Sequence, residues 1–446
     1  MRPSAWLPLA VLSALAVSGA ATRPRYGGTL RVEMRAAPAA LDPAAPDAAP
    51  LASLVFETLV RLDDAGAPQP CLALSWQHDA TAKRWQFNLR PGVKLHDGSP
   101  LTAAAVVAAL EAALPAMTIA ATGDAVIAIH ANHPLPGLLL DLAHIGWLGT
   151  GPFHPTAFEP GNRATFAANE DYWGGRPFLD AIDVRLGRGL RDQLADLELG
   201  KADVVEVGPT DLHRASEHGR TVWSSAAASL IALAFAPDAP GHPGAPRVRE
   251  ALALSIDRAT MYTMLLQKQG DVTAALLPQW ISGYAFAFPT APDLPRARAL
   301  ANAMPPAART LTLTYDPSMR AARSLAERVA VNARDAGLTV QVSTQNPRAD
   351  VRLVEVHLRS LDPQRALAGL AAALGLPAPA TPAGSASPAA LYESERKLLE
   401  GFRAIPLFQL PVFYGAASRV RVYAPPPIAR LGDWRFDNLW LSGTAP

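Results

Sequence analysis

Residues 84–111, RWQFNLRPGVKLHDGSPLTAAAVVAALE, combine a strand pattern, two turn signals and a helix start in one run. From Arg84 to Arg90, apolar and polar side chains alternate, which predicts a half-buried strand. A Pro-Gly pair at 91–92 and an Asp-Gly pair at 97–98 predict tight turns after this strand. Thr102 is a candidate N-cap for an Ala- and Val-rich helix. These elements fix a corner of the backbone but offer no reactive chemistry, so they describe scaffold rather than an active site.

This run resembles the signature region of the family 5 extracellular solute-binding proteins, the peptide- and nickel-type receptors of ABC importers. The matching positions are Leu89, Arg90, Gly92, Val93, His96, Asp97, Gly98, Pro100, Leu101, Thr102, Ala103 and Val106. The run departs from the family pattern at Leu95, where an aromatic residue is usual, and at Ala105, where Asp is usual. An acidic residue three positions after the N-cap would complete a capping box, so Ala105 weakens the helix start.

Other runs resemble further landmarks of the same family and stand in the same order. They are LDP at 41–43 with FETLV at 56–60, GTGPF at 149–153 with NEDYWGGRPF at 169–178, VREALALSIDR at 248–258, and DWRFDNLWL at 433–441. Two segments, 115–148 and 361–390, are shorter than the family usually has. The resemblance covers nearly all of the chain after its first residues.

The resemblance implies a fold and a division of the chain. We expect an α/β protein of the bilobed periplasmic binding protein-like II class with an extra domain, mixed sheets and a discontinuous first lobe. The expected parts are lobe I at 22–50, 152–230 and 412–446, a shortened extra domain II at 51–151, and lobe III at 231–411 with a linker at 376–390.

The first 21 residues are typical of a cleaved signal peptide. Arg2 gives a small positive start, an apolar run extends from Ala5 to Val17, and small residues follow at 18–21. That run is shorter than the ~20 residues needed to span a membrane, and no cysteine stands at the expected cleavage point. We therefore expect an exported, periplasmic protein without a lipid anchor. The single cysteine, Cys71, excludes an intramolecular disulfide and is expected to be a core residue.

Charge and motif content exclude several classes of function. Without Arg2, the basic and acidic residues are equal in number, which argues against nucleic acid as a partner. No P-loop, zinc-protease or serine-hydrolase motif occurs, and His130 and His133 lack neighbouring metal ligands. We therefore expect no catalytic residues, no cofactor and no metal site.

Aromatic residues in loops are the best candidates for a ligand site between the lobes. Arg35, just after the first strand, could meet an acidic group of a ligand. In peptide receptors of the family, an Asp from the last third holds the α-amino group of the ligand, and Asp362 is the nearest match by resemblance. The complete set of predicted ligand-binding residues is Arg35, Trp147, Trp280, Tyr284, Phe286, Tyr414 and Asp362.

The resemblance implies a monomeric receptor that closes around a peptide or small solute and then docks on the permease subunits of an ABC importer. Two alternatives remain open. The shortened segments motivate a receptor-fold sensory or interaction protein that is not coupled to transport. An exported hydrolase would need a Ser or Asp within hydrogen-bond reach of a His in the cleft.

Overall fold

The computed structural model describes residues 23–237, 245–284, 288–344, 346–380, 387–424 and 426–443. The predicted signal peptide and Phe286 lie outside the described residues, as does part of the predicted linker. Among the described residues, no helix is both long and apolar enough to cross a membrane.

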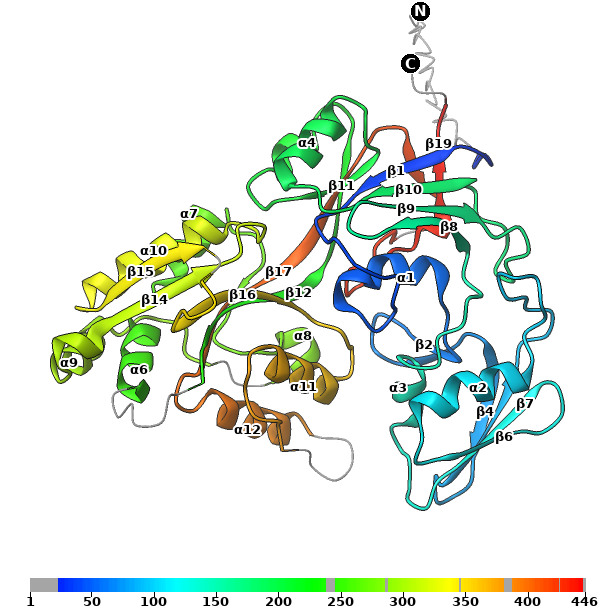
Figure 1. Ribbon diagram of the computed structural model, residues 1–446, viewed down its shortest axis with the longest axis horizontal. Coiled ribbons are helices and arrows are strands. Elements are labelled where there is room, and N and C mark those ends of the chain that lie inside the picture. The colour runs from blue at the N-terminus through cyan, green and yellow to red at the C-terminus, as the bar shows by residue number, and fades with distance from the viewer. Residues whose placement is uncertain are drawn as a thin grey trace, which may run out of the picture.

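Eleven of the described strands form one mixed sheet that extends through both lobes (Figure 1). In spatial order these strands are β15 (Thr339–Thr344), β14 (Thr310–Tyr315), β16 (Val351–His357), β12 (Thr221–Phe235), β17 (Ala404–Ala416), β11 (Val204–Val207), β1 (Thr29–Glu33), β10 (Ala181–Arg185), β9 (Arg163–Ala168) and β8 (Phe153–Glu159), with β13 (Asp271–Val272) paired to β17. β1 is parallel to β10 and β11, and β14 is parallel to β15 and β16. The remaining pairs are antiparallel, which makes the sheet mixed as expected.

Two long strands, β12 and β17, pass from one lobe into the other (Figure 1). They pair from Thr221 to Ser224 on the lobe I side and from Ser229 onward on the lobe III side, with register shifts around Ala227 and Pro411 between the two parts. Such register shifts disrupt the ladder of hydrogen bonds locally, so the two strands are continuous between the lobes but pair irregularly there. The predicted lobe limits after residues 230 and 411 fall inside these strands, and they stay a prediction.

Lobe III, at the left of Figure 1, carries helices on both faces of its part of the sheet. One face packs mainly on α6 (Ala245–Ser255), α7 (Arg258–Leu265), α9 (Leu294–Asn302) and α10 (Ala322–Asp335), near η2 (Pro306–Arg309), and the other on α8 (Gln279–Ser282), α11 (Pro363–Ala373) and α12 (Pro388–Leu399). The VREALALSIDR run forms two helices rather than one, because Asp257 accepts a hydrogen bond from the backbone N–H of Thr260 at 3.0 Å and starts α7.

Lobe I contains the other half of the sheet and a core around Leu30, Val32, Phe153 and Phe166. The small elements of this lobe are η1 (Pro46–Ala48), α1 (Ala49–Val55), α4 (Leu190–Glu198), α5 (Leu212–Ala215), η3 (Phe436–Asn438), and the two-stranded sheet of β18 (Val420–Val422) and β19 (Leu439–Leu441).

The opening run lies in a small domain with its own antiparallel sheet, at the lower right of Figure 1. The sheet has the order β4 (Ala73–His78), β5 (Arg84–Leu89), β7 (Val126–His130) and β6 (Thr118–Ala121), and α2 (Ala103–Ala113), α3 (Leu138–Leu142) and the hairpin of β2 (Val60–Leu62) and β3 (Pro68–Pro70) complete the domain. The strand predicted over 84–90 is confirmed as β5, whose apolar side chains are buried. Thr102 accepts a hydrogen bond from the backbone N–H of Ala105 at 3.2 Å, which confirms the predicted cap of α2.

Three of the sequence landmarks meet at one carboxylate, where the small domain joins lobe I. Glu57 accepts hydrogen bonds from the hydroxyl of Thr150 at 2.7 Å, the hydroxyl of Tyr172 at 3.0 Å and the indole N–H of Trp173 at 2.7 Å. Burial raises the pKa of Glu57, and the three hydrogen bonds oppose this shift only in part. The guanidinium of Arg90 stacks on Trp173 at 4.0 Å, so the opening run is tied to the same cluster.

The single cysteine lies beside this cluster and is a core residue, as expected. Cys71 is 4% exposed, and burial raises the pKa of its thiol to about 12. A thiol with such a pKa is not a nucleophile at neutral pH.

Candidate functional site

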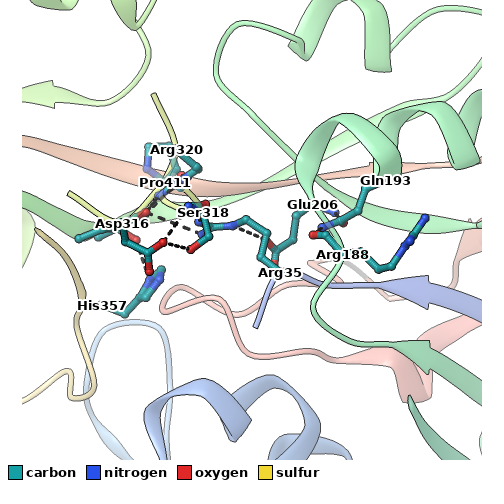
Figure 2. A network of polar contacts seen from close by, with 11 residues as sticks. Arg35, Arg188, Gln193, Glu206, Asp316, Ser318, Arg320, His357 and Pro411 are labelled. Atoms are coloured by element: carbon teal, nitrogen blue, oxygen red, sulfur yellow. Dashed lines mark hydrogen bonds and ion pairs between the residues drawn. The ribbon is translucent and has the colours of Figure 1, made fainter. Parts of the chain in front are cut away.

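A cavity of about 290 Å³ lies where the two lobes face each other. The loop between β14 and α10 and the end of β16 form its lobe III side, and Arg35 comes from lobe I (Figure 2). Its lining residues are Arg35, Asp316, Ser318, Met319, Leu353, Val354, Glu355 and His357. The volume is at the low end of the range for ligand pockets.

Arg35 connects the two lobes directly. Its Nε donates to Glu206 of lobe I at 2.9 Å, its Nη1 donates to the carbonyl oxygen of Ser318 in lobe III at 3.0 Å, and its Nη2 lies 3.7 Å from Glu355. Burial by itself would lower the pKa of Arg35, but the charges of Glu206 and Glu355 outweigh it and raise the pKa. The guanidinium therefore stays charged while it bridges the lobes.

Glu355 is the buried anion of this network. Its side chain is 6% exposed and pairs with Arg320, whose Nε lies 2.9 Å from the carboxylate. Burial would raise the pKa of Glu355, but the positive charges of Arg320 and Arg35 hold it at about 2. Arg320 also donates to the carbonyl oxygen of Pro411 at 2.7 Å, so the network reaches the irregular part of β17 (Figure 2).

His357 lines the cavity two residues beyond Glu355 on the same strand. Its Nδ1 lies 2.7 Å from the hydroxyl of Ser229, its cross-strand partner on β12. Burial is the main cause that lowers the pKa of His357, and the charges of Arg320 and Arg35 add to it against the opposing effect of Glu355. The imidazole is therefore neutral at pH 7.

The Ser229–His357 pair has the contact that the hydrolase hypothesis requires. Ser229, however, is fully buried inside the sheet, with 0% exposure, and is not among the residues that line the cavity. A nucleophile must reach the substrate, and this hydroxyl does not. The pair is therefore a structural hydrogen bond that fixes the imidazole.

The other predicted ligand residues lie away from the cavity lining. Trp147 donates its indole N–H to the carbonyl oxygen of His144 at 3.1 Å. Tyr414 is 2% exposed on β17, and burial raises its pKa. Trp280 on α8 donates to the carbonyl oxygen of Ala227 at 3.2 Å, close to the irregular part of β12.

Two further candidates, Tyr284 and Asp362, make hydrogen bonds within lobe III and do not line the cavity. The hydroxyl of Tyr284 donates to Glu395 at 2.6 Å, and Tyr284 is 8% exposed in the lobe III core. Asp362 accepts from the backbone N–H of Arg365 at 2.9 Å and is the N-cap of α11. Of the predicted set, Arg35 alone is among the cavity-lining residues that the structure describes. A role in ligand binding stays a prediction for all seven.

Sequence reasoning missed the lobe III side of the cavity. Glu355 and His357 stand in RLVEVHL, where alternating polar residues are also typical of a solvent-facing strand edge. Asp316 and Ser318 stand in YDPSM directly after a strand, a position typical of binding loops but equally of ordinary turns. The available signal was the presence of three ionisable residues, Arg352, Glu355 and His357, in a strand otherwise made of Val and Leu.

The chain matches the family model described as bacterial extracellular solute-binding proteins, family 5 Middle, over residues 67–126 and 144–372. The match covers more than half of the chain, and the protein belongs to this family. This confirms the family resemblance, and the prediction of a binding protein rather than an enzyme agrees with it.

Relatives and solved structures support the assignment. The probable D,D-dipeptide-binding periplasmic protein DdpA of Escherichia coli is 23% identical over 249 residues, 48% of each chain. The chain thus spans about half the length of such curated relatives in these alignments.

Solved structures resemble the whole fold. One is the oligopeptide-binding protein AppA of Bacillus subtilis in complex with a nonapeptide, with a TM-score of 0.77, 17% identity, and coverage of 94% of this chain and 100% of that chain. Another is NikA of Brucella suis in complex with Fe(III)-EDTA, with a TM-score of 0.78, 20% identity, and coverage of 93% of this chain and 100% of that chain. These likenesses confirm the predicted fold class.

Proposed function

We propose that this protein is the periplasmic receptor of an ABC importer, which binds a peptide or similar small solute between its lobes and delivers it to permease subunits as a monomer. The observation that carries the proposal is the cavity itself. Its lining comes from both lobes, which are joined by two strands whose pairing is interrupted between them. A hinge at this place would open and close the cavity without disturbing either core.

Arg35 gives closure a physical basis. Its contacts with Ser318 and Glu355 form only when lobe I and lobe III approach each other. A solute held between the lobes adds contacts that exist in the closed state alone, and this differential affinity shifts the population toward closure.

The relatives limit the class of solute. DdpA is named for a D,D-dipeptide, and the compared structures hold a nonapeptide and Fe(III)-EDTA. The cavity of about 290 Å³ favours a solute near the size of a dipeptide or a small chelate over a nonapeptide.

The test is a ligand screen with two readouts. The protein is incubated with a mixture of dipeptides, a nonapeptide mixture or Fe(III)-EDTA, and thermal unfolding and small-angle scattering are measured. A solute at 100 times its Kd adds about 2.7 kcal/mol to the free energy of unfolding, so Tm rises while the radius of gyration falls. If no solute changes either quantity, the receptor role is wrong.

Delivery to a permease needs a separate experiment. Deletion of the gene is expected to abolish uptake of the solute that binds. Unchanged uptake, together with binding in vitro, would favour the sensory alternative over transport.

A further inference from the structure

The position of the hydrogen on the imidazole of His357 determines which group of a solute the ring can bind, and its use here rests on the proposed function. His357 stands at the end of β16, where the sheet face changes from the apolar Leu353 to the polar Glu355 and His357 as it approaches lobe I. The ring lines the cavity (Figure 2), while its Nδ1 faces the fully buried Ser229. The opposite ring nitrogen, Nε2, has no hydrogen-bond partner among the described residues and is the atom available to a solute.

The hydroxyl of Ser229 determines which ring nitrogen carries the hydrogen. Within the described part of the chain, its contact with Nδ1 of His357, at 2.7 Å, is its single hydrogen bond. If Nδ1 carried the hydrogen, the Ser229 oxygen would accept it and the hydroxyl hydrogen would be left buried without an acceptor. Buried polar hydrogens without an acceptor are rare because their desolvation is not compensated. The hydroxyl therefore donates, Nδ1 accepts, and the hydrogen of the neutral ring is on Nε2.

The charges around the ring favour the neutral form. Arg320 and Arg35 lower the pKa of His357 together with burial, and Glu355 and Glu206 oppose them without reversing the direction. The ring thus carries a single hydrogen at neutral pH, and the hydrogen bond from the Ser229 hydroxyl to Nδ1 places it on Nε2.

We propose that His357 presents an Nε2–H donor to the bound solute, so that this point of the cavity selects an acceptor oxygen, such as a peptide carbonyl or a carboxylate, and does not coordinate a metal ion. A ring nitrogen that carries its hydrogen has no lone pair in the ring plane for a metal. The site therefore favours a peptide-like solute, and if a chelate binds, its own oxygens contact His357.

The tautomer is measured directly on the ligand-free protein. Long-range ¹H–¹⁵N spectra of the ¹⁵N-histidine protein at pH 7 are expected to show the Nε2–H form at His357, assigned through its loss in His357→Gln. In Ser229→Ala the donor to Nδ1 is gone, so a mixture of both tautomers is expected. Ser224→Ala is the matched control, because Ser224 is exposed on the same strand, and it should leave the signal unchanged. An Nδ1–H form in the parent protein would overturn the proposal.

Metal coordination is tested with Ni²⁺ alone. Addition of Ni²⁺ is expected to leave the His357 signals as sharp as before, whereas selective broadening of these signals would contradict the proposal. Exposed histidines such as His213 can bind the ion, and their signals are assigned and excluded.

The solute side is tested with a mixture of dipeptides in equilibrium dialysis. Gln keeps an N–H donor, so His357→Gln should retain the same dipeptides within a few-fold. His357→Leu should lose about tenfold in affinity, as expected for one lost hydrogen bond. Equal affinity of the Leu variant and the parent would contradict the proposed contact.

The tautomer measurement and the solute screen can fail independently of each other. Bound dipeptides with an Nδ1–H ring would overturn the tautomer and keep the receptor. An Nε2–H ring with no solute bound in the full screen would overturn the receptor and keep the tautomer.

Discussion

Glu57 and Glu355 are both carboxylates at joints between parts of the molecule, and the protein stabilises them in opposite ways. Glu57 is held by three neutral donors, and burial raises its pKa. Glu355 is held by two guanidinium groups, and its pKa is about 2. Neutral donors satisfy a carboxylate in either protonation state, whereas arginines require its charge. The first arrangement suits a permanent joint. In the second, Arg320 and Glu355 both belong to lobe III, and Arg35 alone reaches this carboxylate from lobe I, so its contact is the one that opening of the lobes would break.

Removal of Arg320, the cation paired with the buried Glu355, should have the largest effect on stability. Arg320→Met should lower the free energy of unfolding by about 3–5 kcal/mol, because it leaves a buried charge with Arg35 alone at 3.7 Å. Urea unfolding followed by circular dichroism measures the loss. Arg323→Met, three residues further along the chain and with its side chain 78% exposed, is the control and should unfold like the parent. Equal midpoints for both variants would show that Arg320 does not neutralise Glu355.

The neutral cluster should be less costly to disrupt. Glu57→Ala should cost about 2–3 kcal/mol, since three donors lose their acceptor but Glu57, Tyr172 and Trp173 are only partly buried. The same urea experiment measures it, and near-UV circular dichroism should report a change around Trp173. Glu111→Ala on the exposed face of α2 is the matched control in the small domain. A stability equal to that control would exclude Glu57 as a joint between the small domain and lobe I.

The two carboxylates should also respond to acid with opposite sign. The pKa of Glu57 is raised above 4.5, so its folded form binds a proton more tightly than the unfolded chain and gains stability as pH falls through the raised pKa. Glu355, at about 2, contributes stability above pH 4.5 that is lost as pH falls toward 2. The loss reaches about 1 kcal/mol at pH 4.

Isosteric variants separate these effects between pH 7 and pH 4. The stability difference between Glu57→Gln and the parent should become less favourable to the variant as pH falls. The difference for Glu355→Gln should become more favourable to the variant by about 1 kcal/mol. Urea midpoints at each pH give both slopes, and slopes of the same sign would contradict the assignment of the two environments.

The sequence indicates the hydrogen-bond partners of Glu57 but not the ion-pair partners of Glu355. Glu57 and its three oxygen and nitrogen donors, Thr150, Tyr172 and Trp173, stand in runs that the family resemblance singles out, 56–60, 149–153 and 169–178. The strand at 84–90 and the helix cap at Thr102 follow from local signals, whereas the small domain as a unit is implied by the family resemblance. The network of Glu355 on β16 includes Glu206 on β11. It also includes Arg35, which follows β1, and Arg320, which precedes α10, and no local pattern relates those positions.

The aromatic candidates show a different limit. Trp280 and Tyr284 stand in an aromatic loop, which predicts ligand contact, but the indole N–H of Trp280 donates to Ala227 and the hydroxyl of Tyr284 donates to Glu395. An amphipathic ring packs in a core as readily as it lines a site, provided that its N–H or O–H finds an acceptor. The presence of such an acceptor is a property of the tertiary structure, and the sequence alone does not reveal it.

A third contact joins the small domain to lobe III. It should contribute least to the free energy of unfolding but should affect the radius of gyration. Asp141 on α3 of the small domain pairs with Arg365 on α11 of lobe III, with side chains 38% and 32% exposed. A pair with this exposure contributes about 0.5 kcal/mol, so Asp141→Asn should barely change the urea midpoint. The contact exists only when lobe III lies against the small domain, and its loss should therefore increase the radius of gyration of the ligand-free protein. Asp124→Asn, exposed in the same domain, is the control for scattering. A contrary outcome would be an unchanged radius of gyration for Asp141→Asn and an increased one for Arg35→Met. In that case the contacts of Arg35 with Ser318 and Glu355, and not the Asp141–Arg365 pair, would hold the lobes together.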